Sequence, residues 1–257
     1  MVRRGLGLGL LAAIGACATA GRELPPETEA ELGSQLAEEL DREMFLVHDT
    51  AVAAPVAEVG RGLGAYAPYA IAPYTFKVVD AETVTAFAVA GGSIYLYRGL
   101  IAESTSMGEI AAVLGHEIAH LAAGHASQKL YEYQRSQLGL GQRLDRSRLL
   151  FLASYSRALE AEADSIAVGL MVAAGWDPAG LLRFFDTLLD LRENEPGVLE
   201  SPFLTHPMIE ERMQSVRRII ERLPSQDMSG LRESSIAYEA LIAELDRLPP
   251  PHRSEFR

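Results

Sequence analysis

Apolar residues recur every three or four positions along most of the chain, a spacing that predicts a largely helical protein. The helices predicted from this spacing lie at residues 28–45, 51–63, 106–124, 149–174, 178–192, 207–223 and 230–248. The third of them opens with a capping box formed by Ser106 and Glu109, and apolar side chains lie on nearly all of its sides. We therefore expect that helix to be buried.

A second pattern covers the middle of the first half, where residues that favour strands are concentrated. Strands are predicted at 74–80, 83–89 and 93–97, and the pair Gly91-Gly92 breaks the chain between the last two. Together the two patterns predict an α+β fold that is mostly helical and contains a small sheet.

The helices and strands read as one domain, because no internal repeat and no second domain is visible in the sequence. We expect this domain at 27–248, after a short tether at 17–26 and before a flexible tail at 249–257. A polar, Arg-rich stretch at 128–148 interrupts the helical pattern. Both a lid over a site and a loop without fixed structure fit that stretch.

Residues 1–16 are typical of a secretory signal peptide. Arg3 and Arg4 give a positive start, and residues 6–14 form an apolar stretch too short to span a bilayer permanently. The sequence Ile14-Gly15-Ala16-Cys17 then resembles the lipobox of bacterial lipoproteins, in which the cysteine is acylated and becomes the mature N-terminus. An ordinary signal peptide with an incidental cysteine is the alternative.

The lipobox implies that the chain is attached to a membrane through lipidated Cys17. In the lipoproteins that it resembles, a residue other than Asp after the cysteine, here Ala18, indicates the outer membrane. We expect a periplasm-facing outer-membrane lipoprotein of a Gram-negative bacterium, with a soluble periplasmic protein as the alternative. After Cys17 no uninterrupted apolar run reaches about 18 residues, so we expect no further membrane span.

Composition excludes several other functions. The chain has 35 acidic and 23 basic residues and a net charge of −12, which argues against a nucleic-acid partner. Because Cys17 is the single cysteine, a disulfide scaffold and a zinc site built on several thiolates are both excluded.

The strongest chemical signal is His116-Glu117-Ile118-Ala119-His120, which matches H-E-x-x-H within a predicted helix. Histidines four residues apart share one helix face, so both imidazoles can bind one Zn²⁺. Glu117 lies about 100° from His116 around the helix, where it can deprotonate a water without binding the metal. The alternative is a buried helix whose histidines are satisfied by hydrogen bonds, but that burial is costly unless something binds these groups.

A third ligand is expected from the helix at 149–174, which carries three carboxylates. Small and apolar residues flank Glu160 on the helical wheel, and they predict that Glu160 is the buried ligand. Asp164, about 40° from Glu160, is placed to accept a hydrogen bond from a ligand histidine. Glu162 lies about 200° away and should be solvated.

His125 is a weaker candidate ligand. In metzincins the third histidine follows the second by six residues after a glycine turn, whereas His125 follows His120 by five and comes directly after Gly124. On a continued helix His125 points about 180° away from His116. We interpret it as a helix-end or packing histidine.

These motifs resemble those of the HtpX-like and CAAX-prenyl-protease-like zinc metallopeptidases, which are gluzincins, and within them a soluble periplasmic lipoprotein branch. The resemblance covers about residues 29–223. It is carried by Ala112-Val113-Leu114-Gly115 before the two histidines, by Ser156-Arg157 before Glu160, Ala163 and Asp164, by Thr205-His206-Pro207 with Arg212, and by the segment from Ala86 to Tyr95.

The resemblance implies a zincin-like fold with the sheet packed on the H-E-x-x-H helix, and one Zn²⁺ per chain held by His116, His120 and Glu160. Glu117 is implied as the catalytic base. His206 and Arg212 are implied to face the active site, where either could stabilise the oxyanion of the transition state. In some relatives a histidine at this loop instead blocks the open position of the zinc. A helix-capping role for His206 and a structural ion pair for Arg212 are equally compatible with the sequence.

The resemblance also implies that a peptide lies extended along the edge strand near Phe87 to Ala90. Two residues depart from the family pattern, which usually has Asn where Thr85 stands and Pro where Ala90 stands. Substrate preference is the property that these departures affect.

The expected function is therefore a zinc endopeptidase that cleaves unfolded or misassembled envelope proteins, with the envelope assembly machinery as a candidate partner. A non-proteolytic chaperone or assembly factor, with a latent zinc site shut by His206, is the main alternative. A small-peptide exopeptidase and a purely structural lipoprotein are further alternatives, and the second leaves the placement of Glu117 and Glu160 unexplained.

Overall fold

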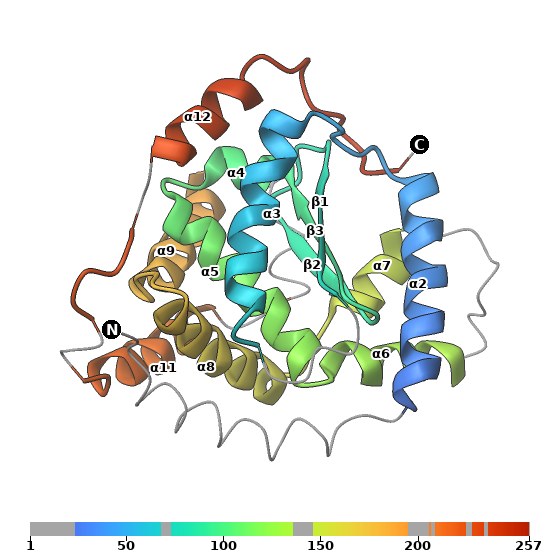
Figure 1. The fold of residues 1–257 in the computed structure, drawn as a ribbon, viewed down its shortest axis with the longest axis horizontal. Helices are drawn as coiled ribbons and strands as arrows, with labels where there is room; N and C mark the ends of the chain where they lie inside the picture. Colours follow the sequence, from blue (N-terminus) through green and yellow to red (C-terminus); the bar gives the residue numbers. More distant parts are fainter. Residues whose placement is uncertain are drawn as a thin grey trace.

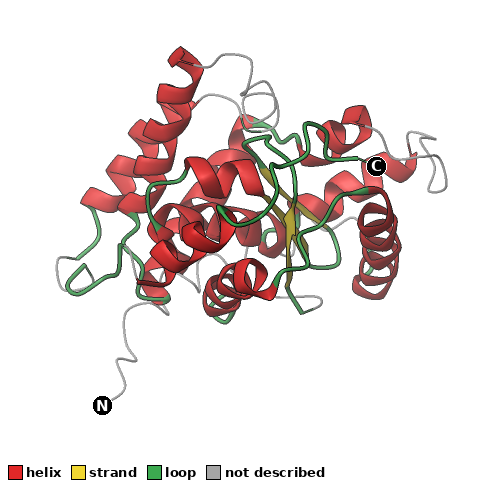
Figure 2. Cartoon of the chain, turned by 90° about the horizontal axis from the view of Figure 1, so that it is seen from above, coloured by secondary structure: helices red, strands yellow, loops and turns green. Residues whose placement is uncertain are grey.

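Three short strands lie at the centre of the molecule, and helices surround them (Figures 1 and 2). The computed structural model describes residues 24–67, 73–135, 146–194, 206, 209–224, 228–233 and 236–256. The expected signal peptide, the lipobox with Cys17, and the middle of the stretch at 128–148 lie outside the described residues.

The sheet consists of β1 (Thr75–Val79), β2 (Ala86–Val89) and β3 (Ser93–Tyr97) in the order β1-β3-β2. The central strand β3 is parallel to β1 and antiparallel to β2. Gly91 and Gly92 have φ values of 86° and 99°, and this left-handed conformation makes the tight turn between β2 and β3. The strand predicted at 83–89 begins only at Ala86 and is shorter than its pattern predicts.

Helices cover both faces of the sheet (Figure 1). On one side lies α2 (Pro26–Glu43), where Asp41 accepts a hydrogen bond from the Tyr95 hydroxyl at 2.9 Å. On the other side α3 (Thr50–Gly64) packs on β1, and α5 (Met107–Ala122) packs on β2 and β3. The apolar core runs through this layer.

The helix with the H-E-x-x-H motif lies at the centre of the domain. All sixteen residues of α5 are buried, and the side chain of Ser106 accepts a hydrogen bond from the backbone N–H of Glu109 at its start. Two further helices pack on α5, namely α8 (Arg157–Ala173) and α9 (Ala179–Asn194). The expected burial of this helix and the mostly helical α+β fold are confirmed.

The remaining described helices are α4 (Arg98–Glu103), α6 (His125–Arg135), α7 (Arg146–Ala153), α11 (Ile209–Glu221) and α12 (Ile236–Leu245). The predicted helix at 149–174 is wrong as a single element, because the chain leaves helical geometry at 154–156. There Ser154 donates its hydroxyl to the carbonyl of Leu150, and Ser156 caps α8 by accepting from the N–H of Leu159. Within the described residues, no helix combines the length and apolar composition needed to cross a bilayer.

The C-terminal residues differ from the flexible tail that the sequence predicts at 249–257. Residues 249–256 pack against the domain, where the ring of His252 stacks on Phe45 at 3.7 Å. Buried Arg98, at the start of α4, donates hydrogen bonds to the carbonyls of Leu245 and Pro249. One arginine thus fixes both the end of α12 and the segment that follows it.

Candidate metal centre

Two elements bring the expected ligands together. The Nε2 atoms of His116 and His120, one turn apart on α5, lie 3.0 Å from each other. Glu160, in the first turn of α8, places its Oε2 3.4 Å from Nε2 of His116 and its Oε1 3.4 Å from Nε2 of His120. His120 and Glu160 are fully inaccessible to solvent, and His116 is 5% exposed. Glu160 is thus buried, as the helical wheel predicts, and Asp164 on the same helix is 1% exposed.

A fourth group, His206, joins the same cluster. Its Nδ1 lies 3.0 Å from one oxygen of Glu160 and 3.4 Å from Nε2 of His116. The ligand atoms of all four residues lie within 4.8 Å of one another. Of the two sequence interpretations of His206, the structure favours the one that places it at the site.

The cluster fits a divalent metal ion in geometry and in charge. A tetrahedral ion with bonds of about 2.0–2.1 Å has ligand atoms about 3.3–3.4 Å apart, close to the separations among the two histidines and the carboxylate. The buried charges at the site are three carboxylates, Glu117, Glu160 and Asp164, and one guanidinium, Arg212. With neutral histidines these sum to a formal charge of −2, which one divalent cation neutralises.

The ionisation of Glu160 and His120 also suits a cation. Burial raises the pKa of Glu160, but the positive charge of His206 and hydrogen bonds from the histidines outweigh it and hold that pKa well below its ordinary value. Burial keeps the pKa of His120 well below its ordinary value. An ionised carboxylate beside a neutral imidazole is the state in which both can bind a metal. For His116, burial lowers the pKa, but hydrogen bonds to Asp164 and Glu160 outweigh burial and raise it to about 9 in the metal-free chain.

Arg212 and Asp164 support the ligands from behind. The Nε and Nη2 atoms of Arg212 donate to the two oxygens of Asp164 at 2.8 and 2.7 Å, and Nη1 lies 2.8 Å from Glu160. Asp164 in turn lies 3.1 Å from Nδ1 of His116, as the sequence predicts. Burial raises the pKa of Asp164, but Arg212 outweighs burial and brings it to about 2. For Arg212 this geometry favours the structural ion pair.

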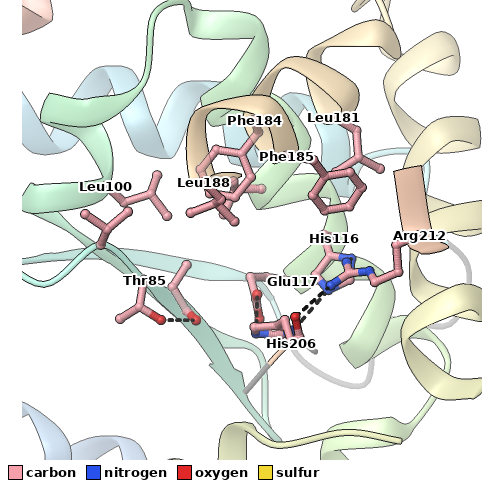
Figure 3. A pocket seen from close by; sticks show the side chains of 13 residues that line it. Thr85, Leu100, His116, Glu117, Leu181, Phe184, Phe185, Leu188, His206 and Arg212 are labelled. Carbon is pink, nitrogen blue, oxygen red and sulfur yellow. Dashed lines mark hydrogen bonds and ion pairs between the residues drawn. The ribbon is translucent and has the colours of Figure 1, made fainter. Parts of the chain in front are cut away.

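Glu117 stands between the ligand cluster and an apolar pocket (Figure 3). Its Oε1 lies 3.7 Å from Nε2 of His206, and its Oε2 has no hydrogen-bond partner among the described residues. Burial raises the pKa of Glu117, and the positive charge of His206 opposes that rise. A buried carboxylate oxygen without a partner is available to a proton or a water molecule.

The pocket beside Glu117 is largely apolar. Its lining includes four side chains of α9, which face His116, Glu117, His206 and Arg212 across the pocket in Figure 3. These four are Leu181, Phe184, Phe185 and Leu188. Residues Val84, Thr85 and Ala86, at the entry to β2, form another part of the lining. The start of β2 and Glu117 therefore line the same pocket.

Two groups lie behind the ligands that were not predicted to contact His120. Tyr155 stacks its ring on His120 at 3.8 Å, and Nδ1 of His125 lies 2.9 Å from Nδ1 of His120. His125 is therefore more than a packing histidine. Gly124 was the feature of the sequence that could have indicated this contact. A glycine often ends a helix, and the helical wheel that points His125 away from His116 assumes that the helix continues.

Comparison with known proteins places this site in a family. The sequence matches the family described as Peptidase family M48 over residues 51–220, about two thirds of the chain. That range contains α5, α8 and all four residues of the cluster, His116, His120, Glu160 and His206.

Individual relatives agree with the family match. The beta-barrel assembly-enhancing protease of Escherichia coli (strain K12) is 26% identical over 223 residues, which cover 77% of this chain and 45% of that protein. Metalloprotease LoiP of the same strain is 35% identical over 166 residues, covering 56% of this chain and 62% of LoiP. Mitochondrial metalloendopeptidase OMA1 of Schizosaccharomyces pombe is 30% identical over 177 residues, covering 64% and 50%.

The chain thus spans 45–62% of the length of these three curated relatives. The family match and the buried cluster of three histidines and a glutamate lead to the same conclusion. The chain belongs to peptidase family M48.

Proposed function

We propose that this chain is a zinc endopeptidase that cleaves unfolded or misassembled proteins of the bacterial envelope. One observation carries the proposal: the unpartnered carboxylate oxygen of Glu117 lies between a buried cluster of metal-binding side chains and an apolar pocket. A buried base between a metal site and a pocket suits hydrolysis of a bond in a bound chain.

His116, His120 and Glu160 would hold the Zn²⁺, and Asp164 would fix the ring of His116 through its Nδ1. When bound at such a site, Zn²⁺ supplies Lewis acidity toward a carbonyl oxygen and lowers the pKa of water to about 7. Arg212 would keep Glu160 and Asp164 ionised and oriented.

Glu117 would then serve as the proton carrier. Its Oε2 accepts a proton from the attacking water and returns it to the nitrogen of the departing amine. Because burial raises the pKa of Glu117, its carboxylate is a stronger base than an exposed one. The apolar walls of the pocket exclude competing water from this transfer.

The substrate would bind as an extended chain beside β2. That strand lies at one edge of the sheet and pairs with β3 in the described part of the chain. Because α2, α6 and α7 contact β2 and the residues of this strand are buried, we place the substrate at the entry of β2, where Thr85 and Ala86 line the pocket, and no longer near Phe87 to Ala90. Folded proteins rarely offer a free extended segment, so this mode favours unfolded substrates.

The location at the envelope rests on the lipobox and on relatives. We propose that Cys17 is lipidated and attaches the chain to the periplasmic side of the outer membrane, as the resemblance of residues 14–17 to a lipobox suggests. The beta-barrel assembly-enhancing protease among the relatives supports an association with envelope assembly machinery.

A second candidate function is a non-proteolytic assembly factor with a latent zinc site. The observation that favours it is His206, whose Nδ1 lies among the ligand atoms where an open position would be needed. In this alternative the zinc helix is a scaffold, and Glu117 has no role.

Metal content and casein cleavage test the proposal on purified chain, Glu117→Gln and Glu160→Ala. We expect one zinc per chain and cleavage in the parent, retained zinc without cleavage in Glu117→Gln, and loss of both in Glu160→Ala. Zinc without cleavage in any sample would favour the assembly factor. No zinc in the folded parent would overturn the mechanism.

A further inference from the structure

The ligand histidine His120 has a partner that the proposed mechanism leaves without a role. Its Nδ1 lies 2.9 Å from Nδ1 of His125, and both side chains are buried, with exposures of 0% and 4%. On the far side of His125, Nε2 faces a carboxylate oxygen of Glu162 at 3.5 Å. Three side chains thus form a row from the metal cluster to the surface, where the side chain of Glu162 is 40% exposed.

The chemistry of imidazole fixes the direction of this row once a metal is bound. A His120 that binds through Nε2 carries its hydrogen on Nδ1, so Nδ1 must donate. The Nδ1 of His125 must then accept, which leaves the hydrogen of His125 on Nε2. That hydrogen points toward Glu162, an acceptor.

The backbone explains why His125 can reach His120 although it follows at a spacing that points it away on a straight helix. Gly124 has a φ of 79°, a left-handed conformation that ends α5 and begins α6 at His125. The change of direction returns the His125 ring toward α5. The ring of Tyr155, stacked at 3.8 Å, holds the other side of His120.

The two ligand histidines are therefore supported in different ways. His116 contacts Asp164 directly at 3.1 Å, whereas the carboxylate that serves His120 acts through an intervening imidazole. Outer partners of this kind fix the tautomer and the ring orientation of metal-binding histidines.

We infer that His125 is a positioning residue that holds His120 in its metal-binding tautomer, and that Glu162 holds His125 in turn. This inference rests on the proposed function, because it assumes that His120 binds the metal. Neither residue is proposed to bind the metal or the substrate.

The test measures the zinc dissociation constant by competition with a chelating chromophore, together with the visible spectrum of the Co²⁺-substituted protein. His125→Leu removes the acceptor, whereas His125→Gln keeps an acceptor oxygen. Glu162→Gln replaces the charged acceptor that faces His125 with a weaker, neutral one. Its matched control is Glu132→Gln, because Glu132 on α6 has the same 40% side-chain exposure. Far-UV circular dichroism verifies folding of each variant.

We expect His125→Leu to weaken zinc binding by about 10- to 100-fold and to alter the Co²⁺ spectrum. His125→Gln should recover most of that loss. Glu162→Gln should bind zinc more weakly than Glu132→Gln, which should match the parent. If His125→Leu does not fold, the comparison of Glu162→Gln with Glu132→Gln decides.

Parent affinity and an unchanged Co²⁺ spectrum in folded His125→Leu would overturn the inference, as would equal affinities of Glu162→Gln and Glu132→Gln. In those cases a parent that binds zinc and cleaves casein leaves the proposed function intact. A folded parent that binds no zinc would overturn both.

Discussion

Arg212 donates two hydrogen bonds of 2.8 and 2.7 Å to the carboxylate of Asp164, and this contact joins α11 to α8 behind the metal cluster. The guanidinium is 7% exposed and also lies over the ring of Phe185 at 4.8 Å. Because its third nitrogen is 2.8 Å from Glu160, one cation contacts two buried carboxylates. Its role at the site is therefore to hold the ligand set together.

We expect Arg212→Ala to lower the free energy of unfolding of the metal-free protein by about 3–5 kcal/mol, because it takes the guanidinium away from two buried carboxylates. Urea unfolding measures the change. Arg217→Ala, at an exposed position of the same helix, should change it by less than about 0.5 kcal/mol. A similar small effect for both variants would mean that Arg212 is not required for stability.

His206→Ala tests whether His206 closes the metal site or stabilises the transition state. Three ligands remain in that variant, so zinc content should stay at one per chain. If His206 closes the site, removing it should raise casein cleavage, roughly 10-fold when the closed arrangement is favoured by about 1.4 kcal/mol. A fall in cleavage with zinc retained would instead assign His206 to stabilising the transition state.

The fold was predictable where the signal is local. The apolar surroundings of α5 and the capping residue Ser106 were enough to predict a buried helix, and the strand formers predicted the sheet. The short helix α4 was missed because Arg98, an arginine in its first turn, gives no sign that it is buried. The partners of Arg98, Leu245 at the end of α12 and Pro249 after it, are about 150 positions away along the chain.

The residues of the site also divide into those with a local sequence signal and those placed by contacts between separate elements. Spacing within single helices predicted that His116, His120, Glu160 and Asp164 lie together, because the helical repeat alone determines which side chains share a face. The positions of His206 and His125 depend on a loop and on a helix end. The packing of separate elements fixes those positions, and one sequence does not encode it locally.

A pair of glycine substitutions tests how closely α2 packs on the turn between β2 and β3. A Cβ added at Gly33 would lie 1.9 Å from the carbonyl oxygen of Ala90, whereas nothing lies within 4 Å of one added at Gly62. We expect Gly33→Ala to destabilise the protein by about 1–3 kcal/mol in urea unfolding. Gly62→Ala, at an exposed position of α3, should stabilise the protein by about 0.5–1 kcal/mol. Equal effects would mean that α2 shifts freely.

Buried Tyr95 predicts how stability changes in alkali. Burial raises the pKa of the Tyr95 hydroxyl, and the charge of Asp41 raises it further. The unfolded chain therefore releases this proton near pH 10 while the folded chain keeps it. The stabilisation is complete below that pH, and it should fall by about 1.4 kcal/mol per pH unit above it.

Urea unfolding at pH 8 to 11 of the parent, Tyr95→Phe and Tyr66→Phe measures this contribution. We expect Tyr95→Phe to be less stable than the parent at pH 8, because it loses the hydrogen bond to Asp41, and to lose less stability above pH 10. Tyr66, which is 46% exposed, provides the control, and its variant should follow the parent. Identical slopes for all three proteins would mean that the Tyr95 hydroxyl ionises without unfolding, and that its contact with α2 is open to solvent.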